Sequence, residues 1–293
     1  MQRRLSGSGL RILTGPVVTC VQSRLSAVAE GIRLLYAEHQ VGGSSDFADF
    51  HVRVDRPFGL RRWLRPQVVF QFDGAPPFNP LPGDQGIPLL EWGLNWCVSG
   101  HLHQFLILHA AVVERRGLAL LLPAPPGSGK STLCAGLVSR GWRLLSDELA
   151  LISPETGDVV PLVRPISLKN ASIAVISRFA PAMTIGPAVH DTLKGSVAHV
   201  KPPLESVRRQ SEPAKPRWVV VPRYAASEPA RLHALPKGRM FMHLADSAFN
   251  YEVHGRRGFD LIGDLVTSCD CYEFSYSDLE EAAGLFNDLA ASA

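Results

Sequence analysis

The sequence predicts a mixed α/β fold in which a larger core, built around a phosphate-binding loop, follows a smaller N-terminal α+β segment. The run from Leu118 to Leu122 is short and wholly apolar, as expected of a strand covered on both faces of its sheet. A glycine-rich loop and a helical pattern follow it directly, which is the order of a strand–loop–helix unit. Hydrophobic residues make up 46% of the 293 residues and charged residues 19%, so the chain can bury a sizeable core.

The first third of the chain alternates strand-like and helix-like patterns but carries no chemical motif. Strands are expected at Gly15–Gln22 and Gln67–Phe72, and a helix is expected from Ile87 to about His103. Trp92 and Trp96 share one face of this helix, and we expect both to pack in the core.

Residues 1–90 are therefore assigned to an N-terminal α+β region of unknown role, and residues 91–293 to the P-loop core. In the core, Phe105–Glu114 is expected to form one buried strand and Trp142–Ile152 another. The polar, proline-rich segment Lys201–Arg217 predicts a mobile loop.

A helix is expected at the end of the chain. Ser277 and Glu280 have the spacing of a capping box. The apolar stripe of this helix consists of Leu279, Ala282, Ala283, Phe286 and Leu289.

A phosphate-binding motif starts at Ala124. The segment Ala124-Pro-Pro-Gly-Ser-Gly-Lys-Ser131 matches the pattern G-x-x-x-x-G-K-[ST], with alanine in place of the first glycine. Gly127 and Gly129 can adopt positive φ and let the backbone approach phosphates closely. Lys130 is then placed for the β- and γ-phosphates of ATP, and Ser131 for Mg²⁺. The predicted nucleotide-binding residues are Ala124, Pro125, Pro126, Gly127, Ser128, Gly129, Lys130, Ser131 and Thr132.

Two acidic residues and a histidine flank this loop in the sequence. Asp147 and Glu148 are embedded between apolar residues, which favours a functional role over an exposed pair. Neighbouring side chains on a strand point to opposite faces, so one of these carboxylates is expected to face the phosphates. His109 lies on an apolar run upstream, where a histidine with no functional role would simply be a core residue.

Together these residues resemble the HPr kinase/phosphorylase family and, within that superfamily, the group of HprK-related kinase A. The acidic pair lies 17 and 18 residues past Lys130, and His109 lies 21 residues before it, in similar positions to those of HPr kinases. The helix after the loop ends at Arg140-Gly141, as in that family. Three further strings look like the related-kinase group: Glu91–Trp96, Arg164–Lys169 and Asn250-Tyr251.

The resemblance implies an αβ core of the type shared by HPr kinases and phosphoenolpyruvate carboxykinase, and transfer of the ATP γ-phosphoryl group to a hydroxyl. It implies ATP and Mg²⁺ as cofactors, with Ser131 and Asp147 as metal contacts. It also implies catalytic roles for Asp147, Glu148 and His109. The acceptor would be a serine or threonine of a small protein or peptide, or a small-molecule hydroxyl.

Two departures from the family limit what it implies. HPr kinases carry two aspartates where this chain has Asp147-Glu148, and the extra carbon of glutamate moves the carboxylate by about 1.5 Å. We therefore expect Asp147 to be the base or the Mg²⁺ contact. Arg164 and Lys169 stand where HPr kinases have a glutamate-bearing signature. They either neutralise phosphate charge or belong to a solvated loop, and the loss argues against phosphorylase activity and against HPr as the acceptor.

A second hypothesis comes from the two positions that differ from the family pattern, Ala124 and Glu148. In this alternative the protein is a nucleotide-gated binding module. ATP orders the segment Lys201–Arg217 around a partner, and no group is transferred.

Composition excludes several other classes of protein. A formal net charge of +3 and no concentrated basic face argue against nucleic acid as a partner. Five scattered cysteines predict free thiols in a reducing compartment, and Cys269 and Cys271 lack the further ligands of a zinc site. Neither a signal peptide nor a run of about 20 apolar residues is recognisable, so we expect a cytoplasmic protein without a membrane partner. The sequence leaves a homo-oligomer open.

Overall fold

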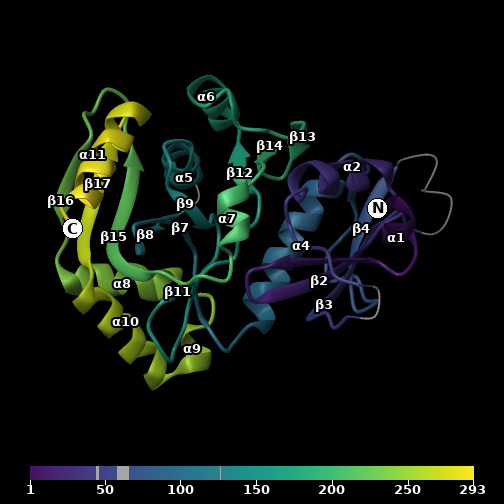
Figure 1. The fold of residues 1–293 in the computed structure, drawn as a ribbon, viewed down its shortest axis with the longest axis horizontal. Helices are drawn as coiled ribbons and strands as arrows, with labels where there is room; N and C mark the ends of the chain where they lie inside the picture. The colour runs from purple at the N-terminus through teal and green to yellow at the C-terminus, as the bar shows by residue number, and fades with distance from the viewer. Residues whose placement is uncertain (44–45, 58–65, 126) are drawn as a thin grey trace.

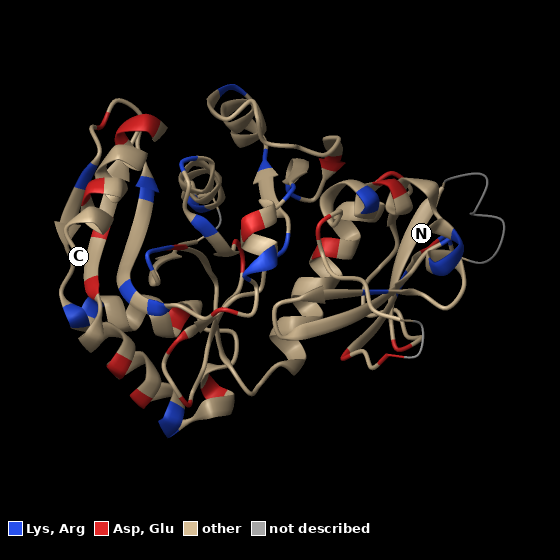
Figure 2. Ribbon diagram, in the orientation of Figure 1, with Lys and Arg blue, Asp and Glu red and all other residues tan. Residues whose placement is uncertain are grey.

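A computed structural model describes residues 1–43, 46–57, 66–125 and 127–293. It shows a mixed α/β protein with an N-terminal unit beside a larger core (Figure 1). Lys and Arg are interspersed with Asp and Glu on the elements of both units in this view (Figure 2). None of the helices in the described ranges combines the length and the apolar character that a membrane crossing requires.

The N-terminal unit is a five-stranded sheet, in the order β1-β2-β3-β4-β5, covered by helices. Its strands are antiparallel neighbours except for the parallel pair β2 and β3. Its elements are α1 (Gln2–Ser6), β1 (Leu10–Thr14), β2 (Val17–Gln22), α2 (Ser26–Leu35), β3 (Phe50–Asp55), β4 (Gln67–Phe72), β5 (Leu81–Pro82) and α4 (Gly86–His101).

The expected strands and helix are present in this unit, with two corrections. The strand predicted at Gly15–Gln22 begins at Val17, because Gly15 has a φ of 62° in the turn that joins β1 to β2. Trp96 is 36% exposed, so the prediction that it packs in the core is wrong. Its ring instead contacts the partly buried rings of Phe72 and Phe78 edge-on.

Helix α4 packs on β3, β4 and α2. The helix and its neighbours share one apolar cluster, in which Leu89, Leu90 and Val98 meet Val52 and Phe70. The division at residue 90 stays a prediction.

The core is built on a six-stranded sheet in the order β16-β17-β15-β8-β7-β9. Strands β8, β15 and β17 are parallel, and the other pairs are antiparallel. The strands and helices of this layer are β7 (Ala110–Arg115), β8 (Leu118–Pro123), α5 (Lys130–Ser139), β9 (Arg143–Ser146), β15 (Lys215–Tyr224), β16 (Arg231–Ala234), α8 (Lys237–Ser247), α9 (Tyr251–His254), α10 (Arg256–Ser268), β17 (Asp270–Tyr276) and α11 (Leu279–Ala291).

Helices cover both faces of this sheet, as the apolar run in β8 predicts. Successive strand residues point to opposite faces. One face packs against α5 and α11 through Ala111, Val113, Leu120 and Leu122. The other packs against α8 and α10 through Ala110, Val112, Ala119 and Leu121. All eight side chains are fully buried, and each Val or Leu among them contributes about 1.5–3 kcal/mol relative to an exposed position.

Two small antiparallel sheets stand between the six-stranded sheet and the N-terminal unit (Figure 1). One consists of β6 (Leu106–Leu108), β10 (Ala150–Ile152) and β11 (Val159–Val160), and the other of β12 (Ile166–Lys169), β13 (Val189–Thr192) and β14 (Gly195–Val200). The remaining helices of the core are α6 (Ala171–Phe179) and α7 (Leu204–Arg208).

The two long strands predicted in the core are each broken at a charged or polar residue. The chain leaves the sheet of β6 at His109 and enters the six-stranded sheet with β7. It returns from β9 to the sheet of β10 across Asp147, Glu148 and Leu149. The predictions of continuous strands are therefore wrong, since the chain exchanges one sheet for another at both places. The breaks bring the three candidate residues to one sheet junction.

Two further predictions are wrong in detail. The expected mobile loop at Lys201–Arg217 contains α7 and the start of β15, and Ser206 and Val207 are buried there. Helix α11 is capped by Asp278, whose carboxylate accepts hydrogen bonds from two first-turn N–H groups, and not by a capping box. Ser277 instead donates its hydroxyl to a backbone carbonyl, that of Glu228.

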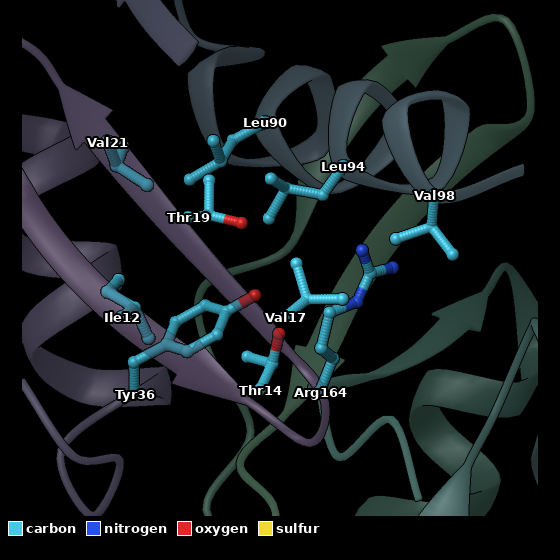
Figure 3. A pocket seen from close by; sticks show the side chains of 10 residues that line it. All are labelled: Ile12, Thr14, Val17, Thr19, Val21, Tyr36, Leu90, Leu94, Val98 and Arg164. Atoms are coloured by element: carbon cyan, nitrogen blue, oxygen red, sulfur yellow. The ribbon is translucent and has the colours of Figure 1, made fainter. Parts of the chain in front are cut away.

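Arg164 joins the two units. Its guanidinium donates to the Asn95 side chain and lies 3.9 Å from a Glu91 oxygen, while Tyr36 donates its hydroxyl to Glu91 at 2.6 Å. Beside this network lies a cavity of about 10 Å³, toward which Thr14 and the Tyr36 hydroxyl point (Figure 3). A cavity of this size holds about one water molecule, so we regard the network as structural.

Candidate active site

The phosphate-binding motif forms a tight loop between β8 and α5. Gly127 and Gly129 have φ values of 89° and 91°, and Gly129 is the N-cap of the helix. A Cβ at Gly129 would lie 2.6 Å from the Tyr276 hydroxyl, so this position requires glycine for space as well as for conformation. Ala124 does not have positive φ, which explains why alanine fits the first position of the motif.

Strands β15 and β17, which lie on the other side of β8 from β7, hold this loop in place. The backbone N–H of Tyr224, at the end of β15, donates to the Ser128 carbonyl at 3.1 Å. The hydroxyl of Tyr276, at the end of β17, donates to the Gly129 carbonyl at 3.1 Å. With these carbonyls bound behind the loop, the first N–H groups of α5, which have no intrahelical partner, remain available for an anion.

Lys130 opens helix α5 and its side chain is buried without a partner. The residue is only 6% exposed, and Nζ has no hydrogen-bond partner among the described residues. Burial lowers the pKa of Lys130, while the charges of Glu148 and Asp147 act in the opposite direction. A buried, unpaired ammonium group is costly, and an anionic ligand would relieve that cost.

Asp147 lies after the end of β9, facing the same space. Its Oδ2 accepts a hydrogen bond from the Ser167 N–H at 2.9 Å, whereas its Oδ1 is buried and unpartnered within the described residues. Burial, together with the charge of Glu148, raises the pKa of Asp147 to about 6. The charge of Lys130, the Ser167 N–H and, last, the Ser131 hydroxyl lower it.

Glu148 is engaged through both oxygens. His109 donates from Nε2 to Oε2 at 3.2 Å, and Lys169 donates from Nζ to Oε1 at 3.3 Å. Burial disfavours the charged form, but the hydrogen bond from His109 and the charges of Lys130 and Lys169 outweigh it and lower the pKa of Glu148. Glu148 is therefore a carboxylate held in place by its neighbours.

His109 is fixed at its sheet junction by the last residue of α8 and by the segment that follows this helix. Its backbone N–H donates to the Ser247 carbonyl at 2.7 Å, and its ring lies edge-on to Phe249 at 5.9 Å. Asn250 binds the preceding strand, accepting from the Ile107 N–H at 3.0 Å and donating to the Phe105 carbonyl at 2.8 Å. These contacts give a structural reason for the Asn250-Tyr251 string in the sequence.

The structure brings most of the predicted residues together around one loop. Lys130, Asp147, Glu148 and His109 interact through contacts or charge, and Ser131 and Thr132 lie on the first turn of α5. Pro126 is outside the described residues. Of the two basic residues predicted to neutralise phosphate charge, Lys169 reaches the carboxylate of Glu148. Arg164 does not, since it is buried at the junction with the N-terminal unit.

Sequence reasoning missed His199 and Lys194. His199 is buried beside Ser167, its register partner, and burial with the charges of Arg164 and Lys169 lowers its pKa to about 4. Lys194 lies over the Trp92 ring at 5.2 Å, at the turn between β13 and β14. Neither residue lies in a recognisable motif, because hairpin pairing far from the loop in sequence places them here.

Comparisons with known proteins give little further information. No protein-family model matches the sequence, and no curated protein is similar to it. Among the solved structures that match is that of the Hpr(Ser) kinase/phosphatase from Coxiella burnetii, over 64% of this chain and 99% of that chain. The sequence identity is 11% and the TM-score is 0.27, which is too low for the match to bear on fold or function.

Proposed function

We propose that this protein is an ATP-dependent kinase that transfers the γ-phosphoryl group to a hydroxyl. The observation that carries the proposal is the pair of buried, unpartnered polar atoms beside the glycine loop, Lys130 Nζ and Asp147 Oδ1. One is a cation suited to a phosphate and the other is an oxygen suited to a proton or a metal. Buried polar groups without partners are rare in folded proteins. These two are close enough for each charge to act on the pKa of the other.

The proposed reaction uses these groups in fixed roles. The acceptor hydroxyl oxygen forms a bond to the γ-phosphorus, the bond from that phosphorus to the β,γ-bridging oxygen breaks, and ADP leaves. The hydroxyl proton passes to the carboxylate of Asp147. Lys130 stabilises negative charge on the β- and γ-phosphates. The products are the phosphorylated hydroxyl, ADP and a proton.

Glu148 acts as a positioning residue in this proposal. Both of its oxygens are occupied by His109 and Lys169, and its pKa is lowered, so it is a poor proton acceptor. Its negative charge helps to raise the pKa of Asp147 to about 6, close to the value that suits a base at neutral pH. Asp147 is therefore the better candidate for the base.

Ser131 and Asp147 are the residues that would hold Mg²⁺. The fit is reasonable because Asp147 keeps a free oxygen and the Ser131 hydroxyl is near it. Mg²⁺ is usually held by one or two protein oxygens together with nucleotide phosphates, so a cluster of three or more metal-binding side chains is not required. None occurs among the described residues. When bound, the ion would neutralise charge on the β- and γ-phosphates.

The test is transfer of phosphate from ATP labelled in the γ-position, with hydroxyl-bearing peptides, small molecules and water as acceptors. We expect Asp147→Asn to lower the rate by about 10²- to 10⁴-fold, because the proton acceptor is lost. Asp84→Asn, a matched change at an exposed site in the N-terminal unit, should leave the rate unchanged. Equal rates for wild type and Asp147→Asn would refute the proposal.

The alternative of a nucleotide-gated binding module depended on a mobile segment at Lys201–Arg217. That segment contains helix α7 and the first residues of β15. The two sequence departures that favoured the alternative, Ala124 and Glu148, both fit the site as it stands. We therefore retain the kinase as the one proposed function.

A further inference from the structure

Three parallel strands end at the edge of the sheet that carries the glycine loop. Strand β8 runs into the loop, and its parallel neighbours β15 and β17 end beside it at Tyr224 and Tyr276. The carboxyl ends of parallel strands lie at the same edge, which is where α/β proteins bind ligands. Both strands beyond β8 therefore end in an aromatic residue at the candidate site.

The two tyrosines differ in burial. Tyr276 is buried under the loop, and its hydroxyl is used by Gly129. Tyr224 is 57% exposed, and its hydroxyl makes no hydrogen bond within the part of the chain that the structure describes. The rings lie 5.9 Å apart at 81°, so Tyr276 packs edge-to-face with Tyr224. Tyr224 is thus an exposed ring braced by a buried one.

Tyr224 is also close to the loop itself. Its Cβ lies 3.3 Å from the position that a Cβ at Gly129 would take, and its N–H is bound to the Ser128 carbonyl. The backbone of this residue is therefore fixed relative to the phosphate-binding groups. Only its side chain is free to meet a ligand.

The order of strands gives the direction in which a nucleotide extends. The sheet runs β9-β7-β8-β15-β17, so the loop after β8 has β7 and β9 on one side and β15 and β17 on the other. Asp147 follows β9 and His109 precedes β7, and phosphoryl transfer requires the γ-phosphate on that side. The opposite end of the nucleotide then lies on the side of β15 and β17.

We propose that Tyr224 stacks on the base of the bound nucleotide and forms the outer part of its binding site. The inference rests on the proposed function, because that function fixes the end of the nucleotide at which the γ-phosphate lies. Stacking of a base on an aromatic ring uses the π-face that every base has. The chemical class of the ligand is thus a nucleoside triphosphate, whose base Tyr224 contacts and whose phosphates the loop contacts.

The test compares ATP with inorganic tripolyphosphate, which has the phosphates and lacks the nucleoside. Dissociation constants are measured by isothermal titration calorimetry. We expect Tyr224→Ala to weaken ATP binding about 5- to 100-fold and to change tripolyphosphate binding less than twofold. Tyr224→Phe should bind ATP as the wild type does, because it keeps the ring. Phe47→Ala, at an aromatic residue that is 77% exposed in the N-terminal unit, is the matched control and should change neither constant.

The remaining outcomes separate this inference from the proposed function. The proposed function fails if the wild type binds neither ligand, or if Lys130→Ala leaves the dissociation constants of ATP and tripolyphosphate unchanged. The inference about Tyr224 then fails as well. If the wild type binds both but Tyr224→Ala weakens neither, or weakens both equally, only the inference fails. Equal weakening would mean that Tyr224 acts on the shape of the loop. A loss in Tyr224→Phe as large as in Tyr224→Ala would assign the effect to the hydroxyl and would also overturn stacking.

Discussion

Strands β7 and β9 carry buried charged residues at both of their ends, and the two clusters differ in how completely they are paired. At one end Glu114 forms an ion pair with Arg143 and accepts from the Gly117 N–H. Arg143 also donates to the carbonyls of Arg209 and Glu212, at 2.9 and 3.0 Å. At the other end, near His109 and the acidic pair, the amino group of Lys130 and one oxygen of Asp147 have no partner among the described residues.

The difference separates a structural cluster from a functional one within a single sheet. A saturated buried ion pair has no capacity left for a ligand, and its removal leaves an uncompensated charge. A cluster in which buried polar atoms lack hydrogen-bond partners lowers the stability of the protein without ligand, and a bound ligand can supply those partners. The unpartnered amino group of Lys130 and the unpartnered oxygen of Asp147 therefore indicate where a ligand would bind.

The largest expected effect follows from breaking one cluster at a time. Glu114→Ala should lower the free energy of unfolding by about 3–5 kcal/mol, because Arg143 is left buried without its carboxylate. Asp147→Ala, at the other end, should lower it by less, because the charge that it removes lies beside that of Glu148, although the Ser167 N–H loses its acceptor. Urea denaturation at pH 7.5 measures both. If Asp147→Ala is the more destabilising change, the assignment of the two clusters is reversed.

A smaller effect is expected in the pH dependence of stability. The folded pKa of Asp147, about 6, is above its ordinary value, so its contribution favours folding at low pH and is lost as pH rises through 6. The folded pKa of His199, about 4, is below its ordinary value, so its contribution is lost as pH falls from 6.5 to 4. In the wild type, the free energy of unfolding therefore falls with rising pH through Asp147 and rises with rising pH through His199, so the two contributions oppose each other.

Asp147→Asn removes one of these contributions. Above pH 6 the variant should be more stable than the wild type, on the order of 2 kcal/mol, and its advantage should disappear as pH approaches 4. Urea denaturation of both proteins at several pH values between 4 and 7.5 gives the difference. A difference that does not change over this range would mean that Asp147 titrates normally.

The smallest effect concerns the buried carboxylate at the junction of the two units. Tyr36→Phe removes a 2.6 Å hydrogen bond to Glu91 and should cost about 1 kcal/mol in the free energy of unfolding. Binding of ATP should be unchanged, since this network is remote from the loop. A loss of ATP affinity in Tyr36→Phe would show that the network around Arg164 belongs to the functional cluster after all.

Local patterns in the sequence predicted the parts of the fold that depend on local structure. Strand β8, the glycine loop, helix α5 and the stripe of α11 each follow from neighbouring residues. The breaks at His109 and at Asp147 could not be predicted, because apolar residues continue on both sides. The change from one sheet to another is decided by which strands pair at a distance.

The candidate site was predictable to the same degree. The loop residues and the acidic pair stand in motifs, whereas His199, Lys194 and Tyr224 reach the site through strand pairings distant in sequence. Arg164 shows the converse. Its charge suggested a phosphate contact, but Glu91 and Asn95 from another part of the chain hold it elsewhere. Only the position of these partners in space distinguishes the two roles.

The parallel pairing of β8 with β15 and of β15 with β17 also determines when the site can form during synthesis. Strand β8, its loop and α5 leave the ribosome long before β15 and β17 are made. The Ser128 carbonyl lacks the hydrogen bond from Tyr224 until β15 emerges. The Gly129 carbonyl already accepts from the Leu133 N–H within α5, but it lacks its second bond, from the Tyr276 hydroxyl, until β17 emerges. The N-terminal sheet pairs mainly strands that are neighbours in the sequence, so it can form early. The apolar strand β8 lacks its neighbour β15 until that strand is synthesised, and during this time one edge of β8 is open to aggregation or to chaperones. A nascent chain that stops before β17 would therefore have the phosphate-binding loop without the hydrogen bond from Tyr276 that supports it.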